Sequence, residues 1–241
     1  AGQMGSADFS GDGSADLLIG SPNLSDSNTK EGRAYLFPGP ITSSTTVTEA
    51  QVTIYGDFGS WSVFGYQVAS AGDTNGDGLP EAMISAEGSS TLGTTYGGAV
   101  YLFEGSTLAG VISADEADSS LIGTQSSGYF GHDISGGRDV NGDGYDDVLI
   151  GASSSSSGAA YVFFGPLDEM DEDANADTVI DTDESGSYLG WRVAMAGDLN
   201  DDGTDDIAFT ELLSDYRESS GGAVGLAFGP LSGNTSLQTA D

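Results

Sequence analysis

Four short acidic segments carry oxygen-bearing side chains at the same offsets. They are DFSGDGSAD from Asp8, DTNGDGLPE from Asp73, DVNGDGYDD from Asp139 and DLNDDGTDD from Asp198. Positions 1, 5 and 9 are carboxylates in every copy, position 3 is serine or asparagine, and position 6 is glycine. Carboxylates this close repel one another unless a positive charge lies among them. The pattern therefore predicts one cation site in each segment.

Each predicted site takes side-chain oxygens from positions 1, 3, 5 and 9 and the backbone carbonyl of position 7. The glycine at position 6 allows the sharp turn that such a loop needs. The twenty predicted metal ligands are Asp8, Ser10, Asp12, Ser14 and Asp16 in the first loop, Asp73, Asn75, Asp77, Leu79 and Glu81 in the second, Asp139, Asn141, Asp143, Tyr145 and Asp147 in the third, and Asp198, Asn200, Asp202, Thr204 and Asp206 in the fourth.

Hard oxygen ligands in this number favour Ca²⁺, which takes six to eight oxygens, over Mg²⁺, which prefers a tighter octahedron and retains its waters. The sequence therefore predicts about four Ca²⁺ ions, one per loop. We expect dissociation constants on the order of 10⁻⁴–10⁻³ M, as in other extracellular calcium modules. Ser10 is a weaker ligand than the asparagines at the same position, so the first site is expected to bind less tightly.

Tight hairpin turns and EF-hands share part of this pattern. Asn-Gly and Asp-Gly also favour tight hairpin turns, but a turn does not require three carboxylates in all four copies. An EF-hand needs a bidentate glutamate at position 12 and flanking helices. Position 12 here is Ile19, Ile84, Ile150 or Phe209. A nine-residue cation loop between two strands fits the sequence better than either.

The loops belong to a longer internal repeat, because their first residues are separated by 65, 66 and 59 positions. Related segments precede the last three loops and follow all four. They are FGYQVASAGD (64–73), FGHDISGGRD (130–139) and LGWRVAMAGD (189–198) before the loops, and RAYLFPG (33–39), AVYLFEG (99–105), AAYVFFG (159–165) and AVGLAFG (223–229) after them. The repeat units are approximately 1–58, 59–124, 125–184 and 185–241, the first and last being incomplete.

Each unit is predicted to contain four short strands. The FG-containing segment forms the first strand, the loop leads to the second, a polar turn leads to the third, and a segment such as QVTIYG (51–56) forms the fourth. The second and third strands are nearly continuously apolar, which indicates burial on both faces. Tandem four-stranded units with both faces covered favour an all-β fold, a β-propeller of four-stranded antiparallel blades. A β-sandwich of four similar hairpin pairs is the alternative.

The units resemble the FG-GAP repeats of integrin alpha subunits and of many bacterial secreted proteins. The pairs Phe64-Gly65, Phe130-Gly131 and Leu189-Gly190, the DxNxDGxxD-type loops and the glycine-flanked third strands carry this resemblance. It implies that each repeat is a propeller blade and that the loop between its first two strands holds calcium. The first unit lacks an FG pair, and Leu189 replaces the usual phenylalanine.

Family members commonly have seven blades, whereas four units are present here. Most of a first strand is missing before the first loop, and the last unit stops before its fourth strand. Three arrangements follow: part of a larger propeller, a closed four-blade ring with one thin blade, or a deficient blade completed by strand addition from a neighbouring molecule.

Composition excludes several function classes. The 241 residues include 38 acidic and 5 basic side chains, a formal net charge of −33. A nucleic-acid partner is excluded, since it requires a basic face, and docking on an anionic membrane is disfavoured. The sequence contains no run of eighteen apolar residues, so no membrane span is predicted. The chain has no cysteine, and its one histidine, His132, is level with Tyr66 and Trp191 in the repeats, which favours a structural role.

The sequence therefore predicts a non-enzymatic, extracellular or cell-surface module. It is expected to be stabilised by calcium and to bind protein partners in adhesion, and self-association into an oligomer or fibre is a further expectation. The alternative is a carbohydrate-binding, lectin-like propeller or a non-catalytic domain of a secreted polysaccharide-degrading enzyme. Propellers host many functions, so the fold alone does not choose between them.

Overall fold

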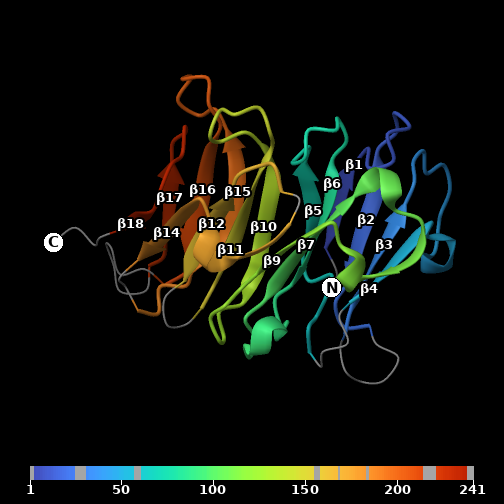
Figure 1. Cartoon of the computed structure of the whole chain (residues 1–241), viewed down its shortest axis with the longest axis horizontal. Coiled ribbons are helices and arrows are strands. Elements are labelled where there is room, and N and C mark those ends of the chain that lie inside the picture. The colour runs from blue at the N-terminus through green and yellow to red at the C-terminus, as the bar shows by residue number, and fades with distance from the viewer. Residues whose placement is uncertain are drawn as a thin grey trace.

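The computed structural model describes residues 3–24, 31–56, 61–154, 158–167, 169–182, 185–213 and 221–237. Within these residues the fold is all-β, with only short 3₁₀ turns, and four sheets lie side by side in the order of the chain (Figure 1). None of the described helices is long and apolar enough to cross a membrane. The helices are η1 (Val47–Glu49), η2 (Thr91–Gly93), η3 (Gly105–Thr107), η4 (Ala114–Glu116) and η5 (Asp173–Asn175).

Each sheet is built mainly from one sequence repeat. Sheet 1 has the order β1 (Met4–Ala7), β2 (Asp16–Ser21), β3 (Arg33–Phe37), β4 (Val52–Tyr55), β8 (Gly110–Ser113); sheet 2 has β5 (Val68–Gly72), β6 (Glu81–Ala86), β7 (Ala99–Glu104), β9 (Ser119–Ile122), β13 (Met170–Glu172); sheet 3 has β10 (Phe130–Arg138), β11 (Asp147–Ala152), β12 (Ala159–Phe163), β14 (Thr178–Thr182), β18 (Thr235–Leu237); and sheet 4 has β15 (Leu189–Gly197), β16 (Asp206–Glu211), β17 (Ala223–Ala227).

The predicted four antiparallel strands are present in each of sheets 1–3, but each of these sheets also has a fifth strand that was not predicted. The outermost strand of each of sheets 1–3 comes from the following repeat and runs parallel to its neighbour: β8 on β4, β13 on β9 and β18 on β14. These strands are only three or four residues long, and none contains more than two consecutive apolar residues, so no apolar run marked them. Sheet 4 has three strands among the described residues. The added strands connect each sheet to the repeat that follows it.

The FG pair joins neighbouring sheets. Phe64 and Phe130 are almost fully buried, as is Leu189 at the same position of the fourth repeat. The glycine after each adopts a positive φ, 81° at Gly65, and a Cβ added to Gly20 in sheet 1 would collide with the Gly65 carbonyl. A side chain at either glycine would therefore separate the two sheets.

Three apolar clusters form the core, one between each pair of successive sheets. We call the side of a sheet that packs on the following repeat its forward face, and the opposite side its backward face. In the cluster between sheets 1 and 2, Leu18 and Leu36 of the forward face of sheet 1 meet Ile84 and Phe103 of the backward face of sheet 2. Burial on both faces, predicted from the apolar runs, is confirmed for β6, β7, β11 and β12, but β2 and β17 are half-exposed.

Candidate metal centre

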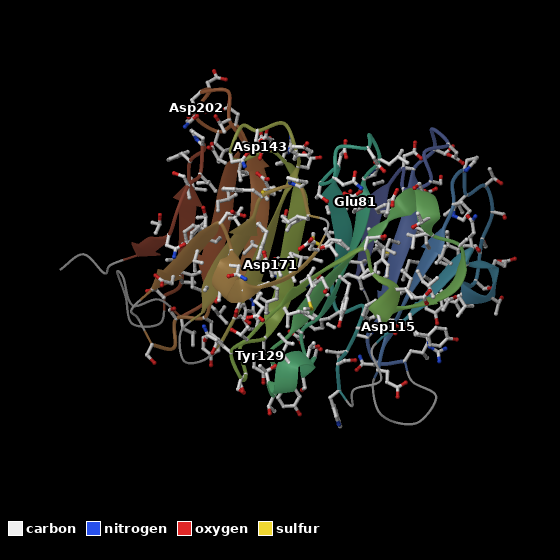
Figure 2. All side chains as sticks on the ribbon, viewed as in Figure 1. Glu81, Asp115, Tyr129, Asp143, Asp171 and Asp202 are labelled. Atoms are coloured by element: carbon white, nitrogen blue, oxygen red, sulfur yellow. The ribbon has the colours of Figure 1, made fainter. Side chains whose placement is uncertain are left out.

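The four acidic loops connect the first strand of each sheet to the second, and they lie along one edge of the molecule. Figure 2 shows Asp143 and Asp202 at the tips of two neighbouring loops on that edge, with Glu81 near the corresponding loop of sheet 2. The repeat therefore places all four predicted sites on the same side of the fold.

The position 1 aspartate folds back over its own loop in every copy. Asp139 accepts hydrogen bonds from the N–H groups of Gly142, Asp143 and Gly144 at 2.6, 3.2 and 2.8 Å. The equivalent aspartates bind the position 6 N–H in the other loops as well: Asp8 to Gly13 at 2.8 Å, Asp73 to Gly78 at 3.0 Å and Asp198 to Gly203 at 2.8 Å. These N–H groups lower the pKa of Asp198, because they favour its ionised form.

Positions 3 and 5 make a second set of matching contacts. The Oδ1 atom of Asn141 accepts the N–H of Asp143 at 2.9 Å, and Oδ1 of Asp143 accepts the N–H of Tyr145 at 2.9 Å. Loops 2 and 4 repeat both bonds, and loop 1 repeats the second. One oxygen of each of these side chains thus fixes the turn. In loops 3 and 4 the second oxygen of the position 5 carboxylate accepts the amide N–H of the position 3 asparagine, at 2.8 Å from Asn141 to Asp143 and 2.9 Å from Asn200 to Asp202.

The position 9 carboxylate plays a role that the sequence did not reveal. Asp147 is fully buried, and its two oxygens accept the N–H of Val140 at position 2, at 2.8 Å, and the N–H of Gly165 after the third strand, at 3.0 Å. Asp206 bonds Leu199 and Gly229 in the same way, while Asp16 bonds Ser10 and Gly39. The glycines Gly39, Gly165 and Gly229 each precede a cis proline. The position 9 aspartates therefore connect the loop, by hydrogen bonds, to the backbone that follows the third strand.

The second loop differs because position 9 is glutamate. Oε2 of Glu81 accepts both the N–H and the hydroxyl of Thr74, at 2.8 and 2.7 Å. Its Oε1 atom is buried and has no hydrogen-bond partner. Burial raises the pKa of Glu81, an effect that the bonds from Thr74 partly offset. A buried carboxylate oxygen without a partner is costly, and this one lies at a predicted ligand position.

Burial also affects the ionisation of Asp147 in the third loop. It raises the pKa of Asp147 to about 7, the two N–H bonds act in the opposite direction, and the charges of Asp139 and Asp143 raise it further. In the part of the chain that the structure describes, no three His, Asp or Glu side chains are gathered so that they could hold a metal ion. The side chains at positions 1 and 5 and the asparagines at position 3 accept backbone N–H groups of their own loop, and the position 9 side chain accepts N–H groups at the base of the loop. Calcium ligation by the twenty residues therefore stays a prediction.

Neighbouring loops are linked to one another. The ring of Tyr145, at position 7 of the third loop, lies over Gly76 of the second, and Leu79 lies over Gly11 of the first. Asp146, which was not among the predicted ligands, accepts the N–H of Asp73 at 2.8 Å and donates its own N–H to the Asp73 carbonyl at 3.1 Å. The sequence signal was present, since position 8 is aspartate only in loops 3 and 4.

His132 lies in a structural contact between repeats, as its alignment predicted. Its ring packs against those of Trp191 and Tyr66, with centroids 4.5 and 5.6 Å apart, and its Nδ1 atom lies 2.7 Å from Glu87 Oε2. The ring is buried, so the three residues after the FG pairs form one packed group.

Comparison with known proteins supports the repeat assignment. The FG-GAP repeat family matches residues 2–37, 64–103 and 130–163. The chain is 31% identical over 170 residues to integrin alpha pat-2 of Caenorhabditis briggsae, covering 66% of this chain and 14% of that protein. It is 37% identical over 152 residues to human integrin alpha-X and 35% identical over 151 to mouse integrin alpha-M, each match covering 61% of this chain and 12% of the relative. The chain thus spans about an eighth of these relatives, and the matches support the FG-GAP family.

Proposed function

We propose that this chain is a calcium-stabilised FG-GAP propeller segment that acts outside the cell as an adhesive, non-enzymatic module. The observation that carries the calcium assignment is the common arrangement of the four loops. In each, side chains at positions 1 and 5 use an oxygen to hold loop N–H groups, as needed to shape a short oxygen-lined turn. A set of ordinary hairpin turns would not require that repetition.

The chemistry of the donors fits a hard divalent cation. Positions 1, 3, 5 and 9 would supply side-chain oxygens and position 7 its carbonyl, in line with the ligands that Ca²⁺ prefers. A carboxylate oxygen has two lone pairs, so the position 9 residues can bond N–H groups and a cation together. The unpartnered Glu81 Oε1 and the raised pKa of Asp147 support this, because a cation would stabilise the ionised form of each.

Bound calcium supplies positive charge that offsets the repulsion among the loop carboxylates. The protein's own contribution is to pin the turn between the first two strands and, through position 9, the end of the third strand. Four ions would change the formal charge from −33 to −25, since each adds two positive charges.

The sheets are proposed to be successive blades of a propeller. Support comes from the inner strands, which pack in series as β1 on β5, β5 on β10 and β10 on β15. The integrin alpha relatives support an extracellular location and protein partners in adhesion. Self-association into an oligomer or fibre is part of the proposal, while binding of glycans remains the alternative prediction.

Titration of the chelator-treated chain with Ca²⁺ by isothermal calorimetry tests this proposal. We expect about four sites with dissociation constants on the order of 10⁻⁴–10⁻³ M, and weaker binding of Mg²⁺. No heat of binding, or equal affinity for the two ions, would overturn the calcium assignment.

A further inference from the structure

We propose that a polar cavity between sheets 2 and 3 binds a neutral polyhydroxylated ligand, such as one residue of a saccharide. The cavity has a volume of about 340 Å³, which is within the range of small-molecule sites. Gly158 and Ala159, where β12 begins, line it, so it lies at the end of sheet 3 opposite the acidic loop. The inference goes beyond the proposed function and does not depend on the calcium assignment.

The equivalent place between sheets 1 and 2 is filled by apolar side chains. Ala114, the first residue of η4, and Ile122 on β9 are 1% and 2% exposed there and belong to the core cluster. In the next repeat the first residue of η5 is Asp173, and the strand pairing places Asp181 at the position of Ile122. Two core residues are thus replaced by carboxylates where the cavity lies.

Hydrogen bonds hold the walls of the cavity in place. Asp173 is 5% exposed, and its carboxylate accepts the hydroxyl of Thr124 at 2.6 Å and the N–H of Thr124 at 3.1 Å. Asn234 Oδ1 accepts the N–H of Val179 at 3.1 Å, which leaves the amide N–H groups of Asn234 for a ligand. The cavity is therefore organised before any ligand enters.

Tyr161 supplies a polar group that lacks a partner. It lines the cavity and is only 6% exposed, yet none of the described residues forms a hydrogen bond with its hydroxyl. Burial raises the pKa of Tyr161, and the charges of Asp173 and Asp181 raise it further, so the hydroxyl keeps its proton. A buried hydroxyl without a partner is costly, and a ligand hydroxyl in the cavity would supply the missing bond.

The mixture of donors and acceptors points to the class of ligand. Among the described lining residues, none is lysine, arginine or histidine; Asp173 and Asp181 accept hydrogen bonds, while Tyr161 and Asn234 can donate them. A metal ion or an ammonium group could accept nothing from these donors. Each hydroxyl of a sugar both donates and accepts, and its bond to a carboxylate is charge-assisted.

Saturation-transfer NMR of the chain with glucose, galactose, mannose or N-acetylglucosamine tests the proposal. Tyr161→Phe removes only the unpartnered hydroxyl, so the fold should be retained, and Asp181→Asn removes a charge from an exposed wall residue.

Each variant has a matched control. Tyr101→Phe makes the same change at the equivalent position of sheet 2, where the residue is also 6% exposed. Asp115→Asn neutralises an exposed carboxylate on η4, outside the cavity (Figure 2).

At least one of the four sugars is expected to bind to the wild type and to both controls. Tyr161→Phe should weaken that binding by about three- to tenfold, and Asp181→Asn by about tenfold or more, as expected for lost hydrogen bonds to a neutral and to a charged group. Absence of saturation transfer to all four sugars would overturn the proposal, as would equal losses in Tyr161→Phe and Tyr101→Phe.

Methylammonium at the same concentration serves as a cationic probe, and its binding in place of the sugars would contradict the ligand class. None of the twenty predicted calcium ligands lines the cavity. Calcium binding by calorimetry is therefore a separate readout, and a chain that binds calcium but no sugar contradicts this site alone.

Discussion

The carboxylate of Asp146 in the third loop accepts the backbone N–H of Asp73 in the second, at 2.8 Å. The return bond, from the Asp146 N–H to the Asp73 carbonyl, measures 3.1 Å. Asp73 is itself position 1 of the second predicted site. The two loops are therefore mechanically joined at a residue that is proposed to hold calcium.

Replacing Asp146 by alanine is expected to lower the free energy of unfolding by about 1–2 kcal/mol, because the half-buried Asp73 N–H loses its acceptor. Asp146→Asn keeps an acceptor oxygen and should lie closer to wild type. Urea unfolding of both variants measures the difference. Equal stabilities for Asp146→Ala and wild type would show that the link contributes nothing.

The fourth loop offers a matched test of the ligand assignment. Asp202 is a predicted ligand at position 5, whereas Asp201 at position 4 is not, and it adopts a φ of 65° where the other three loops have glycine. Both Asp202→Ala and Asp201→Gly remove one negative charge. Calorimetric titration should give about three calcium sites for Asp202→Ala and about four for Asp201→Gly. The same stoichiometry in both would contradict the assignment.

The carboxylate at position 9 should stabilise the fold even without calcium. Asp147→Ala leaves the N–H groups of Val140 and Gly165 without their acceptors, which is expected to cost about 2–4 kcal/mol. Asp143→Ala removes two exposed bonds within the loop, from the Tyr145 N–H and the Asn141 amide, so it should change stability mainly when calcium is present. Chemical unfolding in EDTA separates the two roles. If both variants behave alike in EDTA, the structural role of Asp147 is wrong.

Phe209 occupies space that a tyrosine fills in the other repeats. It pairs with Gly225 across β16 and β17, where the other sheets pair an isoleucine with a tyrosine, such as Ile150 with Tyr161. A Cβ on Gly225 would overlap the Phe209 ring. Gly225→Tyr is therefore expected to destabilise the chain by about 1–3 kcal/mol.

The double variant Phe209→Ile, Gly225→Tyr recreates the pair of the other sheets and should recover most of that loss. Thermal unfolding of the single and double variants checks this. Losses that simply add would argue against the exchange of space between the two positions.

Much of the fold was predictable because short local sequence patterns mark each repeat. The glycine-flanked apolar runs predicted β11 and β12, and the FG pairs predicted the start of β10. The short strands β8, β13 and β18 were missed, since their pairing depends on a distant repeat and not on local apolar periodicity.

The site was predictable as a set of positions but not as a set of contacts. Spacing alone identified Asp139 and Asp143 as members of one loop. It could not show that Asp147 turns toward Gly165, because that partner lies 18 residues further along the chain. Nor could it show that Asp146 reaches Asp73, 73 residues earlier.

Calcium is proposed to hold the four loops in place, and thermal unfolding with Ca²⁺ or with excess EDTA tests this role most directly. At free Ca²⁺ of about 100 times the dissociation constant, each site adds about 2.7 kcal/mol. Four sites would then raise the melting temperature by roughly 20 °C or more for a chain of this size. Mg²⁺ at the same concentration should produce a smaller rise. A melting temperature that is the same in Ca²⁺ and in EDTA would contradict the account.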